Sequence, residues 1–422
     1  MKTKFYTFVA LLATAYVFII PSVGHTSTVS DSVTMGSGYS NEIYYSMSAG
    51  IQGSAIRSTW DIAFRTDRMS ADIITNDGSG VELYTYPLAD TSGWASVDIT
   101  LIGTWKKMYN STTDWETGAF CINQKGHPDY GWCKYNAVTH DLWGDSLFII
   151  KLRDGSLRKL WIKEKFSSLN IYEFRFANID GTGDKTITLD CTPYTSKNFV
   201  GYDITLNKVV DYEPVAATKW DILFTKYMGI NQGQPYPVIG VLSNYKVKVK
   251  KFVHVPTDTI LAAMPAMDIT RSPIGYDWKT FTGTGYKVTD SLVYFVQDLS
   301  GMIHRLVFTK FAGTSTGRIV FNNTMNSFTG INETSKSGFN AAVYPNPVSD
   351  VMNLVINPGK SNLVLVTLMD ITGHIVLSQR FDMQSEELST LQVPVTGLPS
   401  GMYMVKIQSG GNVIARKVIV NN

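Results

Sequence analysis

The stretch Ser58-Thr59-Trp60-Asp61-Ile62-Ala63-Phe64 returns later in the chain as Thr218-Lys219-Trp220-Asp221-Ile222-Leu223-Phe224. The spacing Trp-x-Ile-x-Phe is typical of a strand that buries alternate residues, which would turn the Asp to the opposite side. A Trp beside a carboxylate could also line a ligand slot. The repeated stretch therefore predicts two related β-units, in which this pair has either a structural or a ligand-binding role.

A second repeated block supports the same organisation. Residues 145–166 return as 290–311, and in each copy two apolar strands flank a Gly-containing turn, Asp154-Gly155 or Ser300-Gly301. This pattern is typical of a β-hairpin meander. Another strand follows in both copies. We therefore expect β-meander unit one over 36–182 and unit two over 198–326.

Composition agrees with an all-β fold and narrows the function. The 422 residues suffice for about three domains of ~100–150 residues. Lys and Arg are scattered, and the net charge is only +2, so nucleic acid is not expected as a partner. Motifs for hydrolases, metalloproteases, phosphate binding and dinucleotide binding are absent from the sequence. We therefore expect a protein that is not an enzyme.

The N-terminus has the pattern of a signal peptide over 1–24. Lys2 and Lys4 precede an apolar run that ends near Ile20, and Pro21-Ser22-Val23-Gly24 offers a helix break and small residues for cleavage. The first cysteine is Cys121, so a lipid anchor at the cleavage site is not expected. No later stretch is long enough to span a membrane as a helix.

The C-terminal segment differs from the rest of the chain. A polar linker is predicted over 327–342, and after Phe339 there is no Trp and no Cys. Alternating apolar runs separated by turn residues follow it, which predicts a small Ig-like β-sandwich over 343–422. Asp370 and Gly373 are expected to form a turn between two of its strands, and Pro345 and Pro347 to lie outside strand pairing.

Four motifs in this segment resemble the type A sorting domain of type IX secretion substrates in Bacteroidota. They are Tyr344-Pro345-Asn346-Pro347-Val348, Met369-Asp370-Ile371-Thr372-Gly373, Gly397-Leu398-Pro399-Ser400-Gly401-Met402-Tyr403 and Lys417-Val418-Ile419-Val420. The resemblance implies that the chain crosses the periplasm, that residues 343–422 are recognised by the type IX machinery, and that the product is secreted or held on the outer-membrane surface. An ordinary Ig-like module for binding or spacing is the alternative.

The two units resemble the HmuY family of haem-binding proteins. The resemblance is carried by Trp60-Asp61-Ile62-Ala63-Phe64, Gly131-Trp132-Cys133-Lys134-Tyr135-Asn136 with Thr139-His140, Leu147-Phe148-Ile149-Ile150-Lys151-Leu152-Arg153-Asp154-Gly155 and Lys159-Leu160-Trp161-Ile162. It implies two HmuY-like units that capture haem without a covalent bond, for delivery to an outer-membrane receptor.

Haem capture would require an apolar slot with one or two axial donors facing it. Unit one carries a longer segment between Trp105 and Asp145, and the candidate donors in or near it are His140, His127 and Met108. Unit two offers His254, Met228 and His304. The simpler interpretation makes His127 a turn residue and His140 a surface or capping residue.

Two further expectations concern the cysteines and the alternative function. Cys121, Cys133 and Cys191 allow at most one intrachain disulfide, for which Cys121 and Cys133 are the closer pair in sequence. If the units do not bind haem, they would form a surface adhesion or carbohydrate-contact protein that presents Tyr and Trp side chains to its ligand.

Overall fold

The computed structural model describes residues 28–259, 261, 264–325, 340–357, 363–383, 389–410 and 412–421. The predicted signal peptide and residues 327–339 of the predicted linker lie outside this part. The predicted all-β class is confirmed. Among the described residues the helical elements are 3-10 turns, namely η1 (Ser37–Tyr39), η2 (Arg57–Thr59), η3 (Asp77–Ser79), η4 (Thr91–Ser96), η5 (Ile102–Thr104), η6 (Thr192–Tyr194), η7 (Ala217–Lys219) and η8 (Gly313–Ser315). No helix in the described ranges is long and apolar enough to cross a membrane.

The first sandwich packs a seven-stranded sheet against the sheet β14-β13-β4-β5. The seven-stranded sheet follows the path β12-β11-β10-β8-β7, with β9 paired to β10 and β6 paired to β9. Its strands are β4 (Ile62–Arg65), β5 (Ile73–Thr75), β6 (Glu82–Thr85), β7 (Cys133–Tyr135), β8 (Leu142–Gly144), β9 (Phe148–Lys151), β10 (Leu157–Phe166), β11 (Ile171–Asn178), β12 (Lys185–Asp190), β13 (Phe199–Asp203) and β14 (Lys208–Val210). Phe64 of one sheet stacks on Phe174 of the other, so the core lies between the sheets.

The second sandwich has the sheets β1-β22-β21-β20-β17 and β16-β15-β2-β3, with the small hairpin β18-β19 beside them. Its strands are β1 (Thr28–Thr34), β2 (Asn41–Ser46), β3 (Gly50–Ile56), β15 (Ile222–Asn231), β16 (Gln234–Ser243), β17 (Lys248–Val253), β18 (Lys279–Phe281), β19 (Tyr286–Val288), β20 (Leu292–Gln297), β21 (Ile303–Phe311) and β22 (Arg318–Met325). Phe224 and Phe321 stack across its core.

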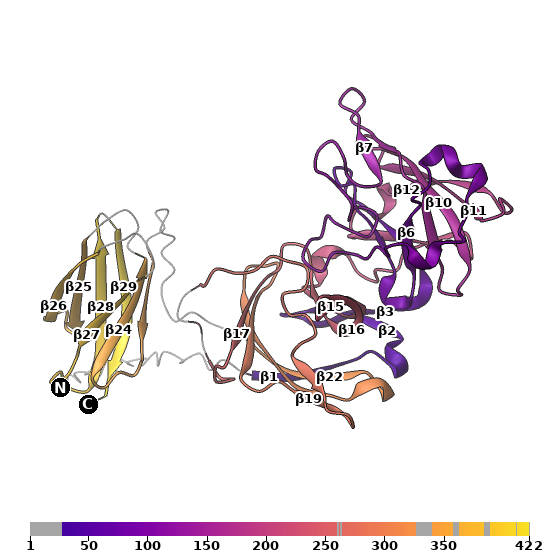
Figure 1. The fold of residues 1–422 in the computed structure, drawn as a ribbon. Coiled ribbons are helices and arrows are strands. Elements are labelled where there is room, and N and C mark those ends of the chain that lie inside the picture. The colour runs from indigo at the N-terminus through magenta and orange to yellow at the C-terminus, as the bar shows by residue number, and fades with distance from the viewer. Residues whose placement is uncertain are drawn as a thin grey trace, which may run out of the picture.

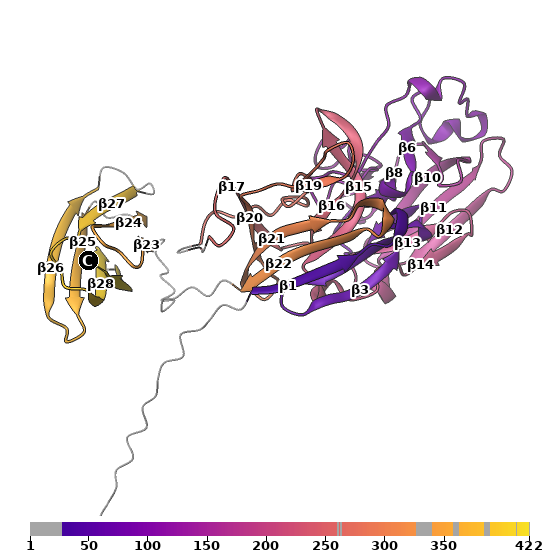
Figure 2. The same ribbon diagram turned by 90° about the horizontal axis from the view of Figure 1, so that it is seen from below.

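The two repeats exchange their first strands. β1 and β2 come from the first repeat but pair with β22 and β15 of the second, and β1 lies along β22 in Figures 1 and 2. β12 and β13 occupy the equivalent positions in the first sandwich, where they pair with β11 and β4. Residues 41–56 of the expected range 36–182 therefore belong to the second sandwich, and residues 199–210 of the expected range 198–326 belong to the first.

The C-terminal segment forms a separate two-sheet core, with the sheets β23-β24-β27 and β26-β25-β28-β29. Asp370 Oδ1 accepts hydrogen bonds from the N–H groups of Thr372 (2.8 Å) and His374 (3.0 Å), which makes the predicted turn before β26. The strands are β23 (Asn340–Tyr344), β24 (Val351–Asn357), β25 (Leu363–Asp370), β26 (Ile375–Asp382), β27 (Ser389–Pro394), β28 (Gly401–Ser409) and β29 (Asn412–Val420).

Candidate functional site

The two predicted histidine donors lie together in an exposed aromatic cluster around β7. The ring of Tyr135 lies 5.1 Å from that of His127 and 5.9 Å from that of His140, measured between centroids. His140 Nδ1 hydrogen-bonds to the Tyr135 hydroxyl, and His127 Nδ1 lies 3.3 Å from the Tyr130 hydroxyl. Both histidines are exposed, so the structure places them on a surface and not in an enclosed slot.

The third predicted donor, Met108, belongs to the core of the first sandwich. It is buried, and its Sδ accepts hydrogen bonds from Thr85 Oγ1 (3.1 Å) and Asn123 Nδ2 (3.2 Å). A long apolar side chain packs readily into such a core. The structure therefore does not bring Met108 to the exposed histidines. In the second sandwich, His304 is also buried and lies 3.1 Å from Asp298 Oδ2.

The three cysteines are buried free thiols, so the structure does not contain the Cys121–Cys133 disulfide considered from the sequence. Burial raises the pKa of Cys121 and of Cys133. It also raises the pKa of Cys191 to about 12. These thiols are inert packing groups in the folded chain.

In the repeated Trp-Asp pairs, the Asp has a structural role and the Trp lines a cavity. Asp61 is fully buried and accepts hydrogen bonds from Arg153 Nε (2.8 Å) and the Ile204 N–H (2.9 Å). Asp221 has the equivalent structural role in the second repeat. The neighbouring Trp60 and Trp220, in contrast, line one shared cavity. The sequence pattern predicted that alternate residues are buried in β4, which follows Trp60-Asp61. This prediction was wrong, because all four residues of β4 are buried.

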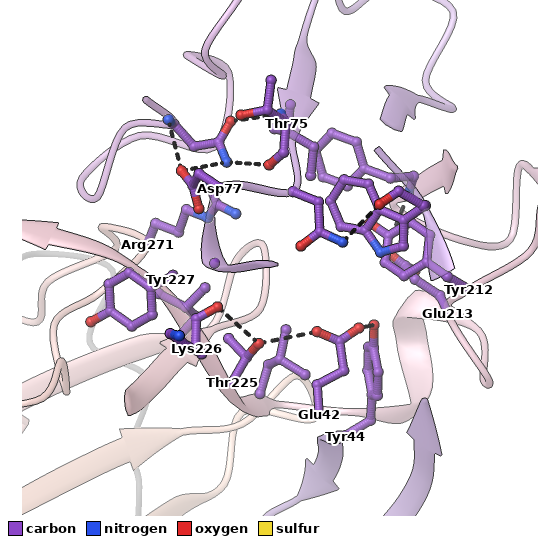
Figure 3. A pocket seen from close by; sticks show the side chains of 18 of the residues that line it. Glu42, Tyr44, Thr75, Asp77, Tyr212, Glu213, Thr225, Lys226, Tyr227 and Arg271 are labelled. Carbon is purple, nitrogen blue, oxygen red and sulfur yellow. Dashed lines mark hydrogen bonds between the residues drawn. The ribbon is translucent and has the colours of Figure 1, made fainter. Parts of the chain in front are cut away.

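This cavity, which we call the junction pocket, lies where the exchanged strands of the two repeats meet. Figure 3 shows Thr75 and Asp77 on one side of it and Glu42 and Tyr44 on the opposite side. Its volume is about 60 Å³, enough for about four to six water-sized groups. A haem would need a far larger slot of at least ~300 Å³. The pocket is lined by Glu42, Tyr44, Trp60, Ile74, Thr75, Asn76, Asp77, Gly78, Asn110, Trp115, Phe199, Tyr212, Glu213, Trp220, Leu223, Thr225, Lys226, Tyr227, Leu242 and Arg271.

Four buried donors that line the junction pocket have no hydrogen-bond partner among the described residues. They are the indole N–H groups of Trp115 and Trp220, the Nε–H of Arg271 and the hydroxyl of Thr75. A buried donor without a partner costs about 1–3 kcal/mol, and native proteins leave few such groups. All four residues line the same cavity, so acceptor atoms placed in it would be near donors that the described protein leaves without partners.

Three carboxyl groups that line the same pocket already accept hydrogen bonds from the protein. Glu42 accepts from the hydroxyls of Tyr44 (2.8 Å) and Thr225 (3.1 Å). Asp77 accepts from Asn110 Nδ2 (2.9 Å), and Glu213 from the Asn198 N–H (2.9 Å).

Burial sets the charge state of these acids. Desolvation raises the pKa of Glu42, that of Asp77 to about 6 and that of Glu213 to about 8. Arg271 opposes this effect at Asp77, and its guanidinium lies 4.8 Å from the Trp115 ring centroid. Near neutral pH, therefore, the pocket carries less negative charge than its three acids suggest.

Sequence reasoning did not single out this pocket. The segment between Trp105 and Asp145 was expected to supply haem donors, but its residues at the pocket are Asn110 and Trp115, and the predicted donors are not among the lining residues. The repeated Trp60 and Trp220 were the available signal for the pocket. Glu42, Glu213 and Arg271 carried no local motif, because their meeting depends on the strand exchange.

Comparisons with solved structures give matches of low structural similarity. A dimeric latent PorU from Porphyromonas gingivalis is 10% identical, with a TM-score of 0.20, over 81% of this chain and 34% of that one. PorZ from the same organism, described as a surface component of the type IX secretion system, is 12% identical, with a TM-score of 0.16, over 71% of this chain and 46% of that one. A polysaccharide lyase is 9% identical, with a TM-score of 0.16, over 94% of this chain and 46% of that one. The chain thus spans between a third and a half of these proteins.

The comparison with family models identifies the C-terminal segment. No curated protein matches the chain, and the comparisons do not support an HmuY-like family. Residues 342–421 match the model described as the secretion system C-terminal sorting domain. The chain is therefore a type IX secretion cargo that carries its sorting domain at residues 342–421 and is destined for secretion or attachment to the cell surface.

Proposed function

We propose that the exported chain is a non-enzymatic carbohydrate-binding protein and that the junction pocket receives the hydroxyl groups along one edge of the sugar. The observation that carries this proposal is that one aromatic-lined cavity is bordered by four residues that each hold a buried donor without a partner, namely Thr75, Trp115, Trp220 and Arg271. Hydroxyl and ring oxygens of a sugar would accept from these donors. The indole and phenol rings would pack against its C–H faces.

The charges of the junction pocket favour a neutral ligand. Asp77, whose pKa is raised only to about 6, is largely charged near neutral pH and opposes an anion, whereas Arg271 and Lys226 oppose a cation. A sugar hydroxyl both donates and accepts hydrogen bonds. It can therefore satisfy an indole N–H and a carboxyl oxygen at the same time, without carrying a charge into a buried site.

The same contacts support binding without catalysis. A hydrolase of glycosidic bonds needs one carboxyl group to give a proton to the leaving group and another to attack or to activate water. Here Glu42 and Asp77 are engaged by protein side chains, and Glu213 by backbone N–H groups. These acids are held as structural acceptors, which supports a binding role in this proposal.

Calorimetric titration of the mature full-length chain with glucose, galactose, mannose and N-acetylglucosamine tests the proposal. Trp220→Phe removes the indole N–H but keeps an aromatic ring, so we expect binding of the preferred sugar to weaken about tenfold, as for one lost hydrogen bond. Trp143→Phe changes a half-exposed Trp on β8, outside the pocket, and should not alter binding. Equal affinity in Trp220→Phe and the parent would contradict the proposal, and so would a folded chain that binds neither these sugars nor their disaccharides.

Haem is a second candidate ligand, which the family resemblance implies and one observation favours. His127 and His140 both engage tyrosine hydroxyls through Nδ1, which leaves Nε2 as the coordinating atom of each ring and fixes the ring orientation. In a haem titration followed by absorbance, this function predicts a saturable Soret shift that His140→Ala abolishes. His374→Ala, in the exposed turn of the sorting domain, is the matched control. A folded chain that gives no shift has no haem-capture function.

A further inference from the structure

A second and larger cavity lies beside the junction pocket. Its volume is about 290 Å³, and it is lined by Thr112, Tyr227, Gly229, Ile230, Lys251, Ser272, Pro273, Ile274, Gly275, Tyr276 and Asp277. We call it the side pocket. Tyr227 lines both cavities, and the adjoining residues Arg271 and Ser272 line the first and the second, respectively. The two cavities thus share a wall.

The wall between the cavities is built by both repeats and fixes the position of Tyr227. Ser272 Oγ donates to the Thr112 carbonyl at 2.6 Å, and the Arg271 N–H donates to the Thr113 carbonyl at 3.2 Å. Gly240 leaves room for the Tyr227 ring, since a Cβ there would lie 3.1 Å from Tyr227 Cε1 and 2.6 Å from the Gly275 carbonyl oxygen. The chain therefore keeps a buried aromatic ring at the boundary of the two spaces.

The side pocket offers paired hydrogen-bonding groups suited to a sugar residue. Lys251 Nζ and Asp277 Oδ2 lie 2.5 Å apart, so a cationic donor and an anionic acceptor stand side by side with no net charge. Two neighbouring hydroxyls of a sugar ring can accept from one and donate to the other. The volume is close to the lower end of the ~300–1,000 Å³ of small-molecule sites, whereas the junction pocket can hold only a few polar atoms.

We infer that the ligand is an oligosaccharide of at least two residues, with one end in the junction pocket and the neighbouring sugar in the side pocket, on the two sides of Tyr227. This inference rests on the proposed carbohydrate-binding function and extends it to the length of the ligand. The shared Tyr227 gives the reason, because its ring contacts both spaces and can pack against the linkage region. A single sugar leaves one of the two cavities without a ligand.

Titration of the mature full-length chain with matched sugars of increasing length tests the inference. Glucose is compared with maltose and cellobiose, galactose with lactose, mannose with mannobiose, and N-acetylglucosamine with chitobiose. We expect a disaccharide to bind at least tenfold more tightly than its monosaccharide. Lys251→Gln should remove most of this gain. Lys248→Gln, on the same strand β17 but exposed and outside the side pocket, is the control.

The outcomes separate this inference from the proposed function. Equal affinities for the monosaccharide and the disaccharide would overturn the two-site inference while carbohydrate binding stands. A tenfold gain that persists in Lys251→Gln would place the second sugar elsewhere and would also overturn it. If none of these sugars binds to the folded chain, the proposed function fails, and the inference fails with it.

Discussion

The backbone N–H of Met47 donates a hydrogen bond of 2.7 Å to the carboxylate of Asp221, 174 residues further along the chain. Asp221 also accepts from the Leu299 N–H at 3.0 Å. Asp61 binds the Ile204 N–H in the same way. Each repeated Asp therefore anchors the backbone just after an exchanged strand, β2 or β13, to the sandwich that receives it.

Removal of this anchor should destabilise the second sandwich. In Asp221→Ala two N–H groups lose their acceptor, so we expect the free energy of unfolding to fall by about 2–3 kcal/mol. Urea denaturation followed by circular dichroism measures the change. Asp211→Ala removes an exposed partner of Lys197 and should cost less than about 1 kcal/mol. Similar losses in the two variants would show that the anchor contributes little.

Loss of the exchanged N-terminal strands should prevent the second sandwich from folding. A chain that begins at Gly50 lacks the buried core residues Val33, Ile43 and Tyr45, each worth ~1.5–3 kcal/mol on burial. The stabilisation lost with these side chains and with the pairing to β22 and β15 approaches the ~5–15 kcal/mol free energy of unfolding of a whole domain.

Limited proteolysis should therefore cut the chain that begins at Gly50 rapidly within residues 222–325. A chain that begins at Thr28 keeps β1 and β2 and should resist cleavage in the same region. Equal resistance of the two chains would show that the second sandwich forms without the exchanged strands.

Local patterns in the sequence predict the strands but not all of their partners. The repeated blocks around Asp154 and Asp298 predict hairpins that the structure contains, and the turn at Asp370 follows from its own side chain. Strand exchange could not be predicted from the sequence. β1 and β12 are equivalent strands of the two repeats, and local patterns do not show which of them pairs with β22. The burial of Met108 was missed for the same reason, since it depends on contacts between distant segments.

The thiols should be unreactive until the protein unfolds. Cys121, Cys133 and Cys191 are buried, and burial raises the pKa of each thiol, so little thiolate forms near neutral pH. We expect negligible labelling by an aromatic disulfide reagent at pH 8 and three equivalents of reaction in guanidinium chloride. Detection of only one thiol after unfolding without reductant would instead reveal a disulfide.

The stability of the chain should fall as the pH rises through the range in which Glu213 stays protonated only in the folded state. Burial raises the pKa of Glu213 to about 8 from its ordinary value of 4.5, so between these values unfolding releases a proton. The stability that the protonated Glu213 carboxyl contributes is fully present below its pKa in the unfolded chain. It is lost at about 1.4 kcal/mol per pH unit as the pH rises towards its pKa in the folded chain. Asp72 and Asp77, with pKa values raised to about 7 and about 6, act in the same direction over narrower ranges.

Glu213→Gln separates the contribution of Glu213 from those of the other acids. The two carboxyl oxygens of Glu213 accept separately from the Asn198 and Phe199 N–H groups. The amide keeps an acceptor for only one of them, but it releases no proton on unfolding. Between pH 6 and 8, where Asp77 contributes little, the free energy of unfolding measured with urea should therefore decline less steeply in this variant than in the parent chain. Asp258→Asn, at an exposed position, should reproduce the parent slope. If Glu213→Gln and the parent chain have the same slope, the Glu213 carboxyl is already ionised in the folded protein, and the junction pocket holds a negative charge that would favour a cationic ligand over a neutral sugar.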